Sequence, residues 1–254
     1  MADYDNRTLS GRASAAEAGL YDAGLRAYML RVYNYMAIGL ALTGLTAYAL
    51  FNASVVTDPS GAILGLTSIG QTLYATPLKW ALVIAPVALV FFLGFRIQRM
   101  SVAAAQATFW IYAALTGASL ATLLMVFTAI SIAKVFFITA AAFGALSLYG
   151  YTTKKDLTGF GSFLFMGLIG IVIASLVNMF LHSGMMSWII SVVGVGIFAG
   201  LTAYDTQKIK NMYYATGSGD QATMGRMAIM GALSLYLDFI NMFIMLLQLL
   251  GDRR

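Results

Sequence analysis

The sequence has no cysteine, one histidine and three prolines, and few of its residues carry a charge. The absence of cysteine excludes disulfides, thiol catalysis and thiolate metal sites. Because His182 is the only histidine, the chain also lacks the grouped imidazoles that metalloprotease chemistry requires. Charged residues make up 10% of the chain, against about a quarter in ordinary soluble domains, while hydrophobic residues make up 60%. This balance indicates a membrane protein.

Apolar runs long enough to cross a bilayer occur repeatedly along the chain. A helix needs about 20 consecutive apolar residues to span the hydrocarbon core. The runs are too long for strands of a membrane barrel, and a helix satisfies its own backbone groups where water is absent. The predicted fold is therefore an all-α membrane protein with seven transmembrane helices. The predicted spans are Val32–Phe51, Pro77–Phe95, Val102–Phe127, Ser131–Tyr151, Phe160–Leu181, Met186–Gln207 and Met227–Leu250.

The chain is expected to form one membrane domain, residues 28–254, preceded by a short tail. Residues 1–27 are polar and of mixed charge, and no apolar run precedes a small-residue cleavage site, so they indicate a tail rather than a signal peptide. The one long loop, 52–76, contains a predicted turn at Asp58, Pro59, Ser60 and Gly61. No internal repeat is visible, which argues against an inverted-repeat transporter.

The basic residues predict the orientation of the chain. Lys and Arg gather in the cytoplasmic loops of membrane proteins, and most of those here lie before the first span or after the second, fourth and sixth. The N-terminus is therefore predicted to be cytoplasmic, and the high pI of 9.4 needs no nucleic-acid partner. A complete seventh crossing would place Arg253 and Arg254 on the other side, whereas a re-entrant segment would return them. Charge leaves the side of the C-terminus open.

Two carboxylates lie inside apolar segments, Asp205 and Asp238. An ionised side chain at depth costs at least about 2.5–3.5 kcal/mol on insertion scales, so it persists when a partner or a function uses it. Asp238 shares one face of a helix with three polar residues, at spacings of four, three and seven: Ser234, Asn241 and Gln248. A polar stripe on an otherwise apolar helix should face the interior of the bundle, which makes the seventh helix a candidate for its centre.

The two carboxylates differ in expected depth. Asp205 lies about one turn before Lys208 and Lys210 at the end of its span, whereas Asp238 lies about 16 Å into its own. They can meet only if the seventh helix begins below the membrane surface or the sixth continues past Lys210. Purely structural interpretations also remain, in which Asp205 is hydrated or paired with lysine and Asp238 bonds to Ser234.

Three stretches resemble the Bax inhibitor family of seven-helix membrane proteins, in particular its bacterial branch. They are ALSLYLDFINMFIMLLQLLG at Ala232–Gly251, GLTAYDTQKIK at Gly200–Lys210 and GYTTKKDLTGFGSFLFMGL at Gly150–Leu168. The similarity extends from the first span to the C-terminus and leaves out only the tail. It implies a bacterial inner membrane and a fold in which six helices surround a central seventh.

The resemblance also implies a function. Family members have a pair of aspartates on the sixth and seventh helices, hydrogen-bonded to one another, that acts as a pH-sensitive plug in a calcium leak. By motif these residues are Asp205, in AYDTQKIK, and Asp238, in LYLDFIN. A latching arginine at the end of the second helix corresponds to Arg96 in FFLGFRIQRM, with Arg99 as the alternative.

The chemistry of paired carboxylates agrees with this expectation. Two carboxylates in contact in a low-dielectric site cannot both ionise cheaply, so they titrate as a unit and respond to pH without histidine. Calcium prefers several oxygen ligands, and Asp205, Asp238 and Asn241 can supply some of them. We therefore expect a weak, transient calcium contact, with calcium ions or protons as partners beside the lipid bilayer, and no cofactor.

Two other classes of function compete with this expectation. Intramembrane aspartyl proteases place a second aspartate in Gly-x-Gly-Asp and follow it with Pro-Ala-Leu, whereas this chain reads Leu-Tyr-Leu-Asp at 235–238 and its only prolines are Pro59, Pro77 and Pro86. An enzyme is therefore not expected. The alternative is a regulator or interaction partner of a membrane-bound quality-control protease that conducts no ion itself. This role would depend on the N-terminal tail and not on the aspartates.

Overall fold

The structure, a computed structural model, describes residues 2–58, 62–216 and 220–254, with side chains from residue 23 onward. Helices dominate it, and seven of them are long and apolar enough to cross a membrane. This confirms the predicted all-α membrane fold. The elements are α1 (Ala2–Ser54), β1 (Val55–Thr57), β2 (Ile63–Leu66), α2 (Ser68–Gly70), the π-helical turn η1 (Gln71–Ala75), α3 (Leu78–Arg96), the 3₁₀ turn η2 (Ile97–Arg99), α4 (Val102–Val126), α5 (Ala129–Thr152), α6 (Thr158–Leu181), α7 (Gly184–Thr216) and α8 (Gln221–Leu250).

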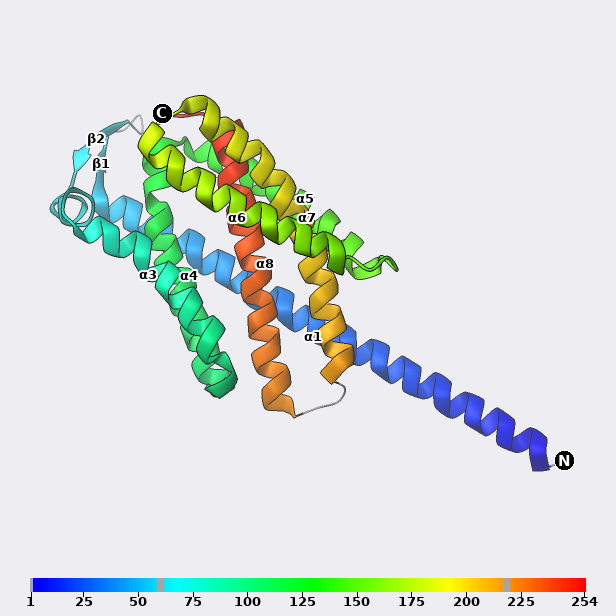
Figure 1. The fold of residues 1–254 in the computed structure, drawn as a ribbon. Coiled ribbons are helices and arrows are strands. Elements are labelled where there is room, and N and C mark those ends of the chain that lie inside the picture. Colours follow the sequence, from blue (N-terminus) through cyan, green and yellow to red (C-terminus); the bar gives the residue numbers. More distant parts are fainter. Residues whose placement is uncertain (1, 59–61, 217–219) are drawn as a thin grey trace.

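Two helices are longer than their apolar runs. From Ala2 on, the backbone of the predicted polar tail continues the first span as one helix, and this part of α1 projects beyond the bundle (Figure 1). Leu25 is already buried, so packing starts before the predicted domain boundary at residue 28. The sixth span likewise continues past Lys210 to Thr216, one of the two conditions for the aspartates to meet. Hydropathy marks only the membrane-embedded part of a helix, whereas the backbone hydrogen bonds of the same helix can continue into water and make it longer.

The long loop after α1 contains a small antiparallel hairpin, in which Val55 of β1 faces Leu66 of β2. Of the predicted turn, residues 59–61 lie outside the described residues. The residues on either side of 59–61 are joined by two hydrogen bonds. Asp58 N donates to Ala62 O at 2.9 Å, and Ala62 N donates to Asp58 Oδ1 at 2.8 Å. The loop is therefore folded back on itself at one end of the bundle (Figure 1).

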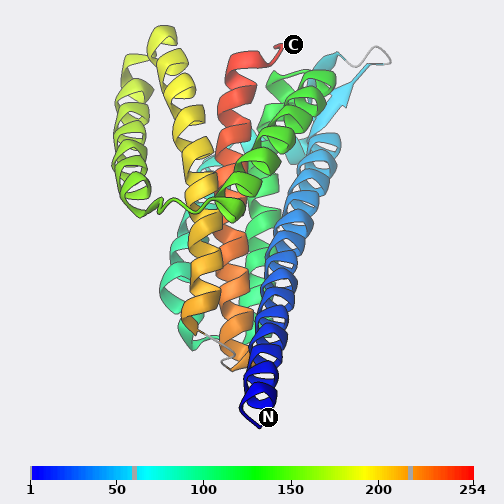
Figure 2. The same ribbon diagram turned by 90° about the vertical axis from the view of Figure 1, so that its right-hand side faces the viewer.

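Helix α8 is the most buried of the seven spans. Half of its apolar window, 50%, is buried, compared with 11% for α6. It packs mainly on α1, α4, α5 and α7, whereas α3 lies against α4 and α6 against α7 (Figure 2). The predicted ring of six helices around a central seventh is thus only partly matched by these contacts.

A buried polar contact lies within this packing. Tyr236 of α8 is wholly buried, and its hydroxyl lies 2.6 Å from Thr43 Oγ1 of α1. The Thr43 hydroxyl also lies 2.8 Å from Ala113 O of α4. Since the single proton of Thr43 goes to a carbonyl, Tyr236 donates to Thr43. These hydrogen bonds thus join α8, α1 and α4.

Glycines set the closest helix contacts. A Cβ at Gly117 of α4 would collide with the Thr43 backbone of α1, and one at Gly150 of α5 would collide with the Ala203 backbone of α7. Small residues allow such close approach in membranes, where lipid is as apolar as the side chains. The α1–α4 and α5–α7 pairs are therefore in direct backbone contact.

The last helix crosses the whole bundle, and the residues after it are fixed to the α4–α5 turn. Thr128 N donates to Asp252 O at 3.0 Å, Asp252 N donates to Ser131 Oγ at 2.9 Å, and Arg254 N donates to Val126 O at 2.9 Å. The C-terminus therefore lies at the same end as the hairpin (Figure 2). This excludes the re-entrant arrangement that the charge pattern left open, while the cytoplasmic side of the molecule stays a prediction.

Candidate functional site

The polar stripe of α8 forms one wall of a cleft between α6, α7 and α8 with a volume of about 1020 Å³. Ser234, Asp238 and Asn241 line this cleft, as their helical spacing predicted. Asp238 is 4% exposed, so the carboxylate is reached only through the cleft. Asn241 donates its Nδ2 to Leu237 O at 2.8 Å, one turn earlier in the same helix.

The facing wall is the end of the apolar part of α7. Asp205 is half-buried there and lines the same cleft as Asp238, together with Tyr204 and Lys208. The Lys208 ammonium lies 5.8 Å from the centre of the Tyr204 ring. The continuation of α7 beyond Lys210 keeps Asp205 within regular helix. The structure thus brings the two predicted aspartates to one site.

The third wall belongs to α6 and is mostly apolar. Gly161 lets this helix lie directly on the Tyr204 ring, since a Cβ there would collide with the ring. Its main contacts are with α7, and it stands away from α8 (Figure 2). The cleft lies between them. Ser162 and Ser175 add hydroxyls from this side. Neither serine was predicted as a site residue, although isolated serines on an otherwise apolar helix indicate a face that is turned away from lipid.

The carboxyl of Asp238 is not fully bonded. Its Oδ2 atom is buried and has no hydrogen-bond partner among the described residues. No hydrogen bond or ion pair joins Asp205 to Asp238 in the described part of the chain, so the direct bond that the family resemblance implies is not formed here. A buried polar atom without a partner is destabilising unless a proton or an ion satisfies it. The Asp238 carboxyl is thus suited to exchange a proton or to contact a cation.

The structure places the remaining predicted residues outside the cleft. Gln248 lies two turns beyond Asn241, where it accepts a hydrogen bond from Ser191 Oγ at 2.7 Å. Arg96 ends α3 and Arg99 ends η2, and both side chains are exposed. Neither arginine lines the cleft, because α3 packs on α4. A contact between either arginine and the aspartate pair is therefore not present in this conformation, and the latching role stays a prediction.

The oxygen donors in the cleft are few for a metal site. The described residues contain no group of three or more His, Cys, Asp or Glu side chains that could hold a metal ion. Calcium takes six to eight oxygens in its stable sites, more than Asp205, Asp238 and Asn241 supply. This donor set fits an ion in passage better than a stored one.

Comparison with known proteins gives the same family along nearly the whole chain. Residues 25–254 match the sequence model of the family described as inhibitor of apoptosis-promoting Bax1. The inner membrane protein YbhL of Escherichia coli (strain K12) is 47% identical over 232 residues, which cover 91% of this chain and 94% of that protein.

Two other relatives are similarly close, and one of them matches the whole chain. A protein of Rickettsia prowazekii (strain Madrid E), RP147, is 46% identical over 254 residues and is covered completely, as is this chain. A protein of Caulobacter vibrioides is 47% identical over 233 residues, 92% of this chain and 91% of that protein. With the seven apolar helices, these matches establish that the chain is an integral membrane protein of the Bax inhibitor family.

Proposed function

We propose that this protein is a non-enzymatic, pH-sensitive cation leak of a bacterial inner membrane, with calcium as the ion and Asp205 and Asp238 as the gate. The observation that carries the proposal is that the two aspartates, on different helices, line one cleft with Ser234 and Asn241. The inner-membrane location is supported by the similarity to YbhL.

The gate works through competition between protons and cations. When both carboxyls are ionised, their repulsion at low dielectric is strong, and a bound proton or a cation relieves it. As pH rises, the pair loses protons and the cleft becomes more negative, so a calcium ion enters it more readily. Calcium flux should therefore rise with pH.

Calcium flux into proteoliposomes between about pH 6 and about pH 8 tests the gate. The native protein should conduct more at the upper pH, and Asp238→Asn and Asp205→Asn should each remove the pH dependence. Asp252→Asn, at the C-terminal end and outside the cleft, is the matched control and should behave as the native protein does. A native flux that is absent or independent of pH, or mutants that titrate like the native protein, would contradict the gate.

The alternative proposal is a regulator of a membrane-bound protease, and the helical projection of α1 beyond the bundle favours it (Figure 1). The backbone of this part of the helix extends away from the other helices (Figure 1). Removal of residues 1–22 leaves the buried Leu25 in place, so the bundle should still fold. The calcium leak should survive this deletion, whereas co-purification of a membrane protease should be lost. Survival of the protease contact would reject the role of the projection.

A further inference from the structure

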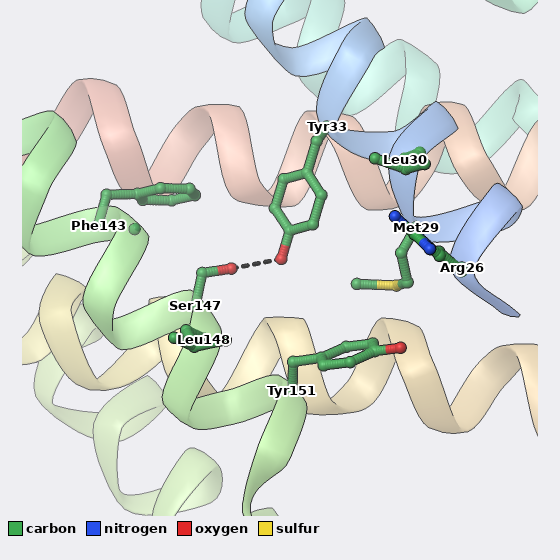
Figure 3. A pocket seen from close by; sticks show the side chains of 9 residues that line it. Arg26, Met29, Leu30, Tyr33, Phe143, Ser147, Leu148 and Tyr151 are labelled. Atoms are coloured by element: carbon green, nitrogen blue, oxygen red, sulfur yellow. Dashed lines mark hydrogen bonds between the residues drawn. The ribbon is translucent and has the colours of Figure 1, made fainter. Parts of the chain in front are cut away.

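A second set of cavities lies along the seam between α1 and α5, which run past each other with few close backbone contacts in the described part of the chain. The first pocket, about 490 Å³, lies between residues 26–33 of α1 and 143–151 of α5 (Figure 3). The second, about 360 Å³, lies between residues 40–48 and 129–137 of the same helices and is closed by side chains of α4 and α8. Because α1 and α5 are antiparallel, the two pockets follow each other along one seam. We call them together the α1–α5 groove.

The walls of the groove are apolar and widened by glycine. Met29, Leu30, Phe143 and Leu148 line the first pocket, and leucine and phenylalanine side chains make up half of the residues that line the second. A Cβ added at Gly144 would have no neighbour within 4 Å, in contrast to Gly150 on the same helix, which touches α7. Gly44 of α1, in the second pocket, likewise faces open space. These glycines leave room in the groove and do not mediate helix contact.

One hydrogen bond crosses the groove. The Tyr33 hydroxyl of α1 pairs with Ser147 Oγ of α5, as Figure 3 shows. Ser147 in turn lies 2.9 Å from Thr206 Oγ1 of α7. This polar bridge holds the two helices at a fixed separation, so the groove keeps its width.

The end of the groove near residue 26 is basic. Arg26 is exposed and lines the first pocket beside Tyr151. Lys210 donates to Tyr151 O at 2.7 Å and lies 5.6 Å from the centre of its ring. Lys154 and Lys155 follow within a neighbouring pocket that also contains Lys210. Basic pockets between membrane helices at the interface are typical binding sites for anionic lipid head groups.

We propose that the α1–α5 groove binds one anionic phospholipid, with an acyl chain along the apolar walls and its phosphate at Arg26 and Tyr151. An acyl chain gains little from apolar walls alone, because the bilayer is equally apolar. Selection therefore depends on charge at the basic end and on space in the groove. This inference rests on the family's membrane location and not on the proposed leak.

Native mass spectrometry of the purified full chain tests the site, with phosphatidylglycerol and phosphatidylcholine of identical acyl chains as probes. We expect phosphatidylglycerol to be retained about fivefold better, the effect of one basic side chain near an anionic surface. Arg26→Gln should remove this preference. The matched control, Arg31→Gln, changes an exposed arginine of the same helix outside the groove and should keep it.

A second variant tests the apolar part. Gly144→Leu fills the first pocket and should abolish retention of the bound lipid, whereas Gly144→Ala should preserve it. Equal retention of both lipids by the native protein, equal losses in Arg26→Gln and Arg31→Gln, or full retention by Gly144→Leu would each overturn the proposal. Thermal unfolding of every variant in detergent confirms that a loss of lipid does not come from a loss of fold.

Discussion

The cleft beside α6 and the groove beside α1 are two cavities of one bundle with opposite chemistry. The cleft contains Asp205 and Asp238, whereas the lining of the groove has no carboxylate and ends at Arg26. Helix α8 separates them. Its polar stripe faces the cleft, and Phe239, Ile240 and Phe243 face the groove. One helix thus presents a carboxylate to the cavity on one side and apolar side chains to the cavity on the other.

The difference arises from how the helices approach their neighbours. On the cleft side, α6 lies tightly on α7 through Gly161 and stands away from α8. On the groove side, α1 approaches α4 through Gly117, and α5 approaches α7 through Gly150, so that α1 and α5 are left apart. Close contacts at glycine in one place therefore produce open space in another.

The largest effect is expected when a close contact of α5 is broken. Gly150→Leu would force a side chain into the Ala203 backbone and should destabilise the fold by about 3 kcal/mol or more, since overpacking a dense contact displaces backbone. Thermal unfolding in detergent measures the loss.

The same substitution on the groove side of α5 provides the control. Gly144→Leu meets open space and should leave stability unchanged or raise it by up to about 1 kcal/mol, through its better helix propensity. Similar losses in both variants would mean that α5 does not divide into a contact side and an open side.

An intermediate effect is expected from an added charge in the cleft. Asn241→Asp places a third carboxylate beside Asp238 and should raise calcium flux about tenfold at the upper pH, equivalent to about 1.4 kcal/mol of added attraction. The rise should be smaller at lower pH, where protons compete with calcium for the carboxylates. Flux into proteoliposomes measures both.

Gln248→Glu is the matched control on the same helix, because Gln248 lies outside the cleft and accepts a hydrogen bond from Ser191. It should leave the flux unchanged. If Gln248→Glu raised the flux as much as Asn241→Asp, the added charge would act through the general surface potential and not within the cleft.

The smallest effect concerns Asp156, an acid in the pocket next to the basic end of the groove. Asp156 Oδ1 accepts hydrogen bonds from Thr158 Oγ1 at 2.6 Å and from Thr158 N at 2.9 Å. These bonds lower the pKa of Asp156 below its ordinary value. A group whose pKa is lowered on folding stabilises the fold above its unfolded pKa, and this contribution is lost as pH falls through the folded pKa.

The contribution of Asp156 should thus be present at neutral pH and disappear only below about pH 4. Unfolding temperatures measured from neutral to acid pH should show a small advantage of the native protein over Asp156→Ala, which vanishes in acid. An advantage of the same size at every pH would show that ionisation of Asp156 contributes nothing.

Much of the fold and part of the site could be predicted from the sequence. The apolar runs predicted the seven spans, because a bilayer requires about 20 apolar residues per crossing. The spacing of Ser234, Asp238 and Asn241 predicted one polar face, because helical periodicity is fixed by the backbone. Gln248 shares this face but lies two turns beyond Asn241 and outside the cleft, where it bonds to Ser191. A shared face thus does not guarantee a shared cavity.

Other features depend on contacts that hydropathy does not encode. Arg96 matched a motif, yet its helix packs on α4 and leaves the side chain exposed away from the cleft. The α1–α5 groove also had no signal, since glycine at 144 is compatible with both close contact and open space. Only the neighbours of each glycine distinguish the two.

The sequence by itself determined that the chain crosses the membrane seven times and that two carboxylates lie within its apolar segments. Both follow from the cost of placing polar groups in hydrocarbon, which each segment meets on its own. The tertiary structure alone decided that Asp205 and Asp238 share one cleft and that α1 and α5 remain apart. The lateral order of helices depends on which surfaces fit closely, because lipid is as apolar as the side chains and favours no particular neighbour.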